Sequence, residues 1–394
     1  MWPRRTLRTS TSPAGGARDL GQIRSRRGVG VSPKQVVEPV AVAEGGQPHV
    51  GRSRGARPMS PVRRLVGSGS NVGPLVAMVA VLVVLGATGS ELWIDVANLA
   101  IIAALGAIGL DLLLGHTGLI SVGNAGLLAI GAFVVAGVNR EMEVPFVLAV
   151  VLSGIVCGIV GMIVALPALR ITGLYLAIAT MGFHFVTIWA LREWQTRQVG
   201  DSGLVVPIAT ILGWELLDLR AWFVFLSVFL VLVLLGYRAL VTSRPGRALH
   251  AIRERPALAL MSGISVTRHK VSAFALSSVL IGVSGAFTAY YIGNVSYGTF
   301  QSFHIAIEYL AMVILGGLGT VYGPVIGAGV IVVLPYVIRE LRLVLGLADV
   351  IETTQIYLVQ GAVVGLVVSA MVIFQPRGLV GIGSSMSRLF RRKL

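Results

Sequence analysis

The chain has 394 residues, of which 55% are hydrophobic and only 12% are charged, and its mean hydropathy is +0.84. A soluble domain carries about 25% charged residues, so this composition excludes a protein built around one water-soluble core. It predicts an all-α, polytopic transmembrane helix bundle whose net charge of +15 lies outside the apolar layer.

The first segment, residues 1–65, differs from the rest of the chain. It is rich in Arg, Gly, Ser and Pro and carries 13 Lys or Arg residues against three acids. Such a segment buries too little apolar surface to fold alone, and its basic region is too long for a signal peptide. We expect a disordered basic cytosolic tail, with Met59 as an alternative start of the chain.

Ten apolar runs, within a transmembrane domain at 71–376, have about the length needed to cross a bilayer. The runs at 124–138 and 304–318 are short, and a broken or re-entrant segment fits them as well as a full crossing. A basic C-terminal tail follows at 377–394. The ten runs are 73–90, 96–114, 124–138, 145–168, 172–192, 221–241, 270–293, 304–318, 322–339 and 356–375.

The distribution of positive charge predicts the orientation of these runs. With the N-terminus inside, 26 of the 32 Lys and Arg residues fall on inner segments and six on outer loops. Positive charge gathers on the cytoplasmic side of membrane proteins. We therefore expect a multi-pass protein of the cell (plasma or inner) membrane with both termini cytosolic. The basic patches then need no nucleic acid as a partner.

A short basic segment, residues 242–270, separates two of the apolar runs. Pro245 suits a first helical turn, Pro256 restarts a helix, and Gly263 suits the position just after a helix end. The side chains fall on two helical faces, Ala248, Leu249 and Ile252 on one and Arg247, His250 and Glu254 on the other. This pattern predicts a short amphipathic helix pair, which fits either a helix lying on anionic lipid or a helix docking into a groove of a cytosolic partner.

Four stretches of the sequence together carry a resemblance. They read GRALHAIRERPALALMSGISVTRHKVSAFALSSVLIGVSGAF (246–287), GLDLLLGHTGLISVGNAGLLAIGAF (109–133), IEYLAMVILGGLGTVYGPVIGA (307–328) and, more weakly, GLYLAIATMGFHFVTIWA (173–190). Taken in their order along the chain, they resemble the LivM-type permease subunits of branched-chain amino acid ABC transporters. The tail at 1–65 lies outside the resemblance.

The resemblance implies the permease subunit of an ATP-binding-cassette importer for branched-chain or related amino acids. It implies three kinds of partner: a homologous second permease, two cytosolic ATPase subunits, and an extracellular or periplasmic substrate-binding protein. It also makes 242–270 the cytosolic coupling loop that contacts the ATPases. The coupling residues that we expect there are Arg247, His250, Ile252, Arg253, Glu254 and Gly263.

The sequence agrees with ATP hydrolysis on another polypeptide. The motif G-x-x-x-x-G-K-[ST], which cradles nucleotide phosphates, does not occur, and none of the three lysines follows a glycine. We expect ATP and Mg²⁺ on the partner subunits and no cofactor on this chain. The scattered histidines predict no metal site, and no residue is expected to be catalytic.

Two acids lie inside predicted spans, where charge is costly and commonly functional. Asp111 and Glu308 each fit a polar translocation path or gate. Asp111 equally fits a carboxylate bonded to backbone near a helix end, and Glu308 a position near the outer interface. The polar residues Thr117, Ser121 and Asn124 follow Asp111 in a glycine-rich stretch that either lines the path or packs helices closely. Tight turns and close packing are the expected roles of Gly115, Gly118, Gly316, Gly317, Gly319 and Gly323.

Other function classes make different predictions. An importer of the same superfamily for an amide, urea or a sugar would share all these features. A secondary transporter driven by an ion gradient would work without an ATPase, and the basic loop would then have no role in transport. A membrane-embedded enzyme would need paired acids, a nucleophile with its base, or metal-ligand spacing, and the sequence has none of these.

Overall fold

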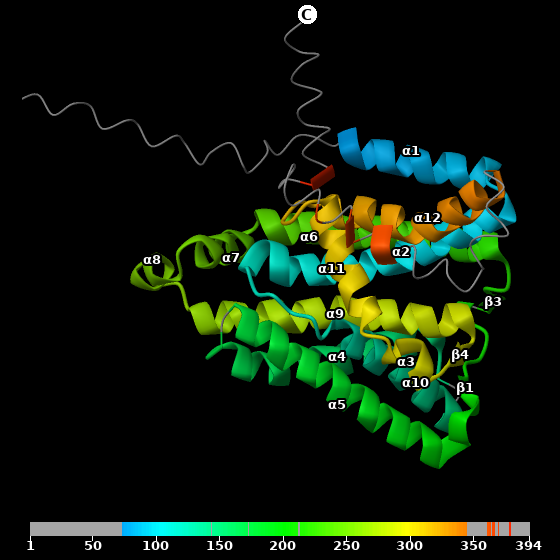
Figure 1. The fold of residues 1–394 in the computed structure, drawn as a ribbon, viewed down its shortest axis with the longest axis horizontal. Helices are drawn as coiled ribbons and strands as arrows, with labels where there is room; N and C mark the ends of the chain where they lie inside the picture. The colour runs from blue at the N-terminus through cyan, green and yellow to red at the C-terminus, as the bar shows by residue number, and fades with distance from the viewer. Residues whose placement is uncertain are drawn as a thin grey trace, which may run out of the picture. The chain divides into compact units, whose positions relative to one another are not determined.

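The computed structural model describes residues 73–142, 144–171, 173–211 and 213–344, and short pieces between 361 and 379. Helices make up most of this part of the chain, and its strands are only two residues long (Figure 1). The expected all-α architecture is confirmed. The predicted tail at 1–65 lies outside the described residues, as do most residues of the last predicted span, at 356–375, and of the tail at 377–394.

Nine of the predicted apolar runs coincide with helices in the described ranges. Six of these, α2 together with η2, α4, α5, α6, α9 and α12, are long and apolar enough to cross a membrane, judged by length and composition. The helices α1 and α11 are apolar but shorter, with 16 and 13 residues. The nine helices are α1 (Gly73–Thr88), α2 (Glu91–Asp111), α3 (Asn124–Glu141), α4 (Phe146–Ala168), α5 (Leu174–Val199), α6 (Leu219–Thr242), α9 (Val266–Ile292), α11 (His304–Gly316) and α12 (Gly323–Val344).

Shorter elements connect these helices. At one end lie η2 (Leu112–Thr117), α7 (Arg244–Glu254) and α8 (Pro256–Met261). The strands and the remaining short helices are η3 (Gly200–Ser202), β1 (Leu204–Val205), β2 (Thr210–Ile211), β3 (Trp214–Glu215), β4 (Asn294–Val295) and α10 (Tyr297–Gln301). Strand β1 pairs antiparallel with β4, Leu204 opposite Val295, which ties together two loops at the other end.

The centre of the bundle is α9, which packs against α2, α3 and α4 (Figure 1). Small residues bring the backbones together, because lipid gives little hydrophobic drive for apolar helices to associate and close packing must supply it. Gly282 of α9 lies against Gly131 of α3, where an added Cβ would meet main-chain atoms. The hydroxyl of Ser153 lies 3.0 Å from the carbonyl oxygens of both glycines and so links three helices.

Because successive helices run in alternating directions, each connecting segment lies at one of the two ends of the bundle. The segment after α2, the α7–α8 loop and the turn at 317–322 share one end, because Asp111 and Gly115 contact Gly319 and Arg253 there. The strand pair β1–β4 marks the opposite end. Both glycine-rich stretches singled out in the sequence therefore meet the α7–α8 loop, although they are about 200 residues apart.

Candidate functional site

The candidate site begins at the last turn of α2. After Asp111 the α-helix widens into η2, and the chain leaves it at Gly118, whose φ of +72° is left-handed and favours glycine. Gly115 allows a close approach here: a Cβ at this position would lie 2.5 Å from the backbone nitrogen of Gly319 and would collide with the Asp111 carboxylate. The end of α2 and the turn at 317–320 can touch only because this residue lacks a side chain.

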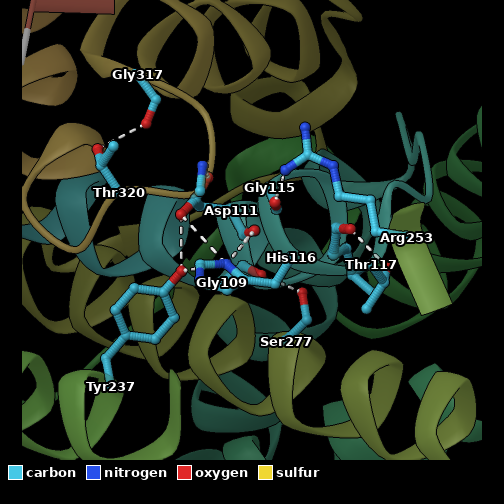
Figure 2. Close-up of polar contacts among 12 residues, drawn as sticks. Gly109, Asp111, Gly115, His116, Thr117, Tyr237, Arg253, Ser277, Gly317 and Thr320 are labelled. Carbon is cyan, nitrogen blue, oxygen red and sulfur yellow. Dashed lines mark hydrogen bonds and ion pairs between the residues drawn. The ribbon is translucent and has the colours of Figure 1, made fainter. Parts of the chain in front are cut away.

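The carboxylate of Asp111, at the end of α2, is fully buried and accepts hydrogen bonds from two other segments of the chain (Figure 2). Its Oδ2 accepts a hydrogen bond from the hydroxyl of Tyr237 on α6, at 2.7 Å. Its Oδ1 accepts one from the backbone N–H of Gly319, at 2.8 Å. A buried carboxyl group without partners would be strongly unfavourable, so these two bonds are what makes the burial tolerable. Asp111 therefore joins α2 to α6 and to the turn between α11 and α12.

His116 extends this group toward the loop helix α7. Its Nδ1 lies 3.1 Å from the Tyr237 hydroxyl oxygen and 3.8 Å from Asp111 Oδ2. Because the hydroxyl of Tyr237 donates to Asp111, Nδ1 of His116 faces two acceptors, the tyrosine oxygen and, at 3.4 Å, the backbone carbonyl of Asp111. This favours the tautomer with the proton on Nδ1. The His116 ring lies 4.9 Å from the ring of His250 on α7, measured between centroids. A continuous chain of contacts runs from Asp111 to α7.

The helix α7 is held on the bundle by a second contact. The guanidinium of Arg253 donates a hydrogen bond to the backbone carbonyl of Gly115 (Figure 2). The apolar side chains of Leu249 and Ile252 are buried, so this face of α7 packs inward. His250 lies between the two faces; burial and the positive charge of Arg253 lower its pKa below the usual range for histidine, and Glu254 opposes this shift.

The remaining predicted coupling residues lie farther from the bundle. Arg247 is exposed, and its guanidinium donates to the carbonyl of Thr242 at 2.8 Å. Glu254 is exposed at the end of α7. Gly263 has a left-handed φ of +78° just after α8, where its N–H bonds to the Leu260 carbonyl and the next N–H bonds to that of Ala259. This is the Schellman arrangement that ends a helix at a glycine.

The predicted translocation residues fall at two separate places. Thr117 is buried beside the Asp111 group and bonds to the Leu113 carbonyl at 2.6 Å. Ser121 and Asn124, in the stretch that follows, are also buried. Glu308 is half-buried in the first turns of α11, where one carboxylate oxygen lies 3.4 Å from Nδ1 of His304. The structure thus brings Thr117 to Asp111 but leaves Glu308 toward the opposite end of the bundle.

The turn between α11 and α12 is built on close backbone contacts at four glycines, Gly316, Gly317, Gly319 and Gly323. Gly317 and Gly319 have φ values of +123° and +71°, which a residue with a side chain rarely adopts. A Cβ on Gly316 would collide with the backbone of Gly323, so α11 and α12 meet directly at this point. Thr320 fixes the turn by donating to the Gly317 carbonyl at 2.7 Å. The turn presents the N–H of Gly319 to Asp111.

Tyr237 is the site residue that the sequence did not single out. It lies inside the apolar run of α6 and looks like one more lipid-facing aromatic residue. One signal was present, since a buried tyrosine hydroxyl normally needs a polar partner, and Asp111 needed one as well. Nothing in the spacing, however, joins residues that are 126 positions apart. Within the described ranges, no three His, Cys, Asp or Glu side chains lie together as metal ligands would.

Comparisons with known proteins agree on one family. A family profile described as "branched-chain amino acid transport system / permease component" matches residues 92–374. The high-affinity branched-chain amino acid transport system permease protein LivM of Salmonella typhimurium is 30% identical over 293 residues, which cover 68% of this chain and 65% of the relative. The protein of the same name from Escherichia coli is 29% identical over the same shares.

A more distant relative carries a different name. The probable branched-chain amino acid transport permease protein LivH of Methanocaldococcus jannaschii is 30% identical over 213 residues, which cover 52% of this chain and 64% of the relative. The chain spans 65% of the length of the two LivM relatives. No solved structure matches it.

Proposed function

Since the chain belongs to the branched-chain amino acid transport permease family, we propose that it is the membrane-spanning permease subunit of an ATP-binding-cassette importer for branched-chain or related amino acids. It is a multi-pass membrane protein, and its relatives are named as transport permeases, not as enzymes. The absence of the nucleotide-binding motif from the sequence supports ATP and Mg²⁺ on separate ATPase subunits.

The proposed partners follow from three features of the chain. Its similarity to relatives named LivM and LivH supports pairing with a second, homologous permease. The α7–α8 loop, with its excess of positive charge, supports a cytosolic position for that end and for both termini, with two ATPases docked there. The opposite end, with β1, β4 and α10, then faces the substrate-binding protein.

The observation that carries the proposal is the attachment of α7 to the transmembrane bundle. Arg253 binds the end of α2, and His250 contacts His116, which leads through Tyr237 to Asp111 and Gly319. A displacement of α7 by an ATPase would therefore move α2, α6 and the α11–α12 turn together. In this account Asp111 positions these helices against one another, and the apolar tip of α8 contacts the ATPase. That tip exposes Leu258, Leu260 and Met261.

Uptake by a reconstituted complex tests the proposal. The full chain is purified with its second permease and ATPases, placed in proteoliposomes, and supplied with its binding protein and labelled leucine. We expect uptake with ATP and Mg²⁺ and none with a non-hydrolysable analogue. Unlabelled amides, urea and sugars serve as competitors. Strong competition by one of them would identify that compound, instead of an amino acid, as the substrate. Uptake by the chain alone on an ion gradient would instead identify a secondary transporter.

A further inference from the structure

A cavity of about 500 Å³ lies between the first turns of α7 and the segment that leads into α9. Its lining includes Arg244 and Arg247 from α7 and His269 from α9, together with Gly263, Ile264 and Ser265. None of these contacts belongs to the Asp111 site, which lies on the inward face of α7. Two of its lining residues, Arg247 and Gly263, are among the coupling residues that the sequence predicts.

The chemistry of the lining favours an anion. It includes no acid, and between 238 and 270 seven Lys or Arg residues stand against one acid, Glu254. Arg247 uses one N–H on the Thr242 carbonyl, and a guanidinium has five N–H donors in all. Such a planar fork matches the oxygens of a phosphate group. His269 keeps its Nδ1–H on the carbonyl of Ser265, at 2.9 Å, so its Nε2 can donate to a phosphate oxygen only when the ring carries a second proton.

The position of the cavity indicates which phosphate it meets. The span α6 ends at Thr242 and the span α9 begins at Val266, so the cavity lies where two apolar helices leave the hydrocarbon layer. Phospholipid headgroups occupy this level, and basic pockets at the cytoplasmic ends of transmembrane helices bind anionic ones. Pro245, Ala248 and Ile264 add apolar wall beside the charged groups, which suits the glycerol and upper acyl part of a lipid better than a free ion.

We propose that this cavity binds the phosphate-bearing headgroup of an anionic phospholipid in the adjoining leaflet, held by Arg244 and Arg247. The bound lipid would fix the start of α7 to the membrane surface. Arg253 of the same helix is already bonded to Gly115. The loop would then be held by the protein on one side and by lipid on the other.

Native mass spectrometry of the full-length detergent-purified chain tests this site. The chain is titrated with phosphatidylglycerol and, separately, with phosphatidylcholine. We expect preferential retention of phosphatidylglycerol and, in Arg247→Gln, a loss of affinity of about fivefold, the usual effect of one basic residue near an anionic surface. The double variant Arg244→Gln/Arg247→Gln should lose more. Equal elution volumes and helical content establish that each variant is folded.

Two further arms decide between sources of the anion. Arg255→Gln removes the same charge from an exposed residue of the loop outside the cavity, and it should retain phosphatidylglycerol as the parent does. An equal loss in Arg255→Gln, or no loss in Arg247→Gln, overturns the proposal. Displacement of the lipid by millimolar inorganic phosphate also overturns it and identifies a site for free phosphate. None of these readouts depends on transport, so they stand apart from the proposed importer function.

Discussion

Arg253 of α7 donates a hydrogen bond to the carbonyl of Gly115, 138 residues away at the end of α2. The last carbonyls of a helix have no partner within it, and a cation at that end is favourable. The loop helix therefore completes the terminus of a transmembrane helix. If α7 moved away alone, it would leave a partly buried carbonyl without its donor, so α7 and α2 are expected to move as one body.

Replacing Gly115 by alanine tests the close approach between η2 and the 317–320 turn. The new methyl group would collide with Asp111 and Gly319, and overpacking of this kind costs about 1–3 kcal/mol of unfolding free energy. Gly182→Ala on α5 is the matched control, because nothing lies within 4 Å of its Cβ position. That variant should be stabilised by about 0.5–1 kcal/mol, as a helix glycine is on change to alanine. Thermal unfolding in detergent measures both, and similar shifts in the two variants would contradict the packing described.

Removing the hydroxyl of Tyr237 tests the hydrogen bonding of Asp111. In Tyr237→Phe the buried carboxyl group loses one of its two donors, and we expect a loss of about 1–3 kcal/mol in unfolding free energy. Tyr175→Phe is the control, because Tyr175 is 76% exposed on α5 and should tolerate the change. In the double variant Tyr237→Phe/Asp111→Asn the loss should be smaller than the sum of the two single losses, since both substitutions alter the Tyr237–Asp111 contact. Additive losses would show that the two side chains act independently.

The docking of α7 should weaken in acid. Burial and Arg253 hold the pKa of His250 below its usual value of 6.5, so the folded loop favours the neutral ring. As the pH falls below 6.5, the undocked loop takes up a proton more readily than the docked one, and stability is lost. Hydrogen exchange in Arg244–Glu254 should therefore speed up between pH 7.5 and 5.5, beyond the intrinsic change in exchange rate. The extra change should vanish in His250→Gln, and a pH response that persists in this variant would assign it to another group.

The role of Glu308 in the translocation path remains a prediction, and the uptake kinetics of a Glu308 variant test it. In Glu308→Gln the half-buried carboxylate loses its charge while keeping its shape, and we expect a higher KM for uptake, because a charge that meets a zwitterionic solute would be missing. The control is Glu340→Gln, an exposed acid of α12. Unchanged KM and kcat in Glu308→Gln would remove this residue from the path and leave it as an interfacial partner of His304.

The helices were largely predictable from the sequence, because apolar length alone specifies a membrane span. The α7–α8 pair was predictable too, since Pro245, Pro256 and Gly263 mark its boundaries by backbone chemistry. The contacts among Asp111, Tyr237 and Gly319 were not, because helix packing inside a membrane leaves no periodic pattern that pairs one apolar run with another. The pairing of β1 with β4 was also missed, since two-residue strands are too short to show alternation.

The inward face of α7 gives one more example of this limit. The sequence separates an apolar face with Ile252 from a polar face with Glu254, but it does not say which face meets the bundle and which meets a partner. In the structure Ile252 is buried, so the change Ile252→Asp would disturb the loop itself before any partner was affected. For this reason Arg253, which is bonded through a single contact to the backbone, is the better residue with which to test coupling.

Simultaneous measurement of ATP hydrolysis and leucine uptake by the reconstituted complex carrying Arg253→Ala tests the central claim most directly, with Arg268→Ala as an exposed control of equal charge. Losing a charged hydrogen bond worth about 1.5 kcal/mol should reduce uptake about tenfold while hydrolysis continues. The control should retain both activities. Normal uptake in Arg253→Ala, or a parallel loss of hydrolysis and uptake, would contradict transmission through the Arg253–Gly115 contact.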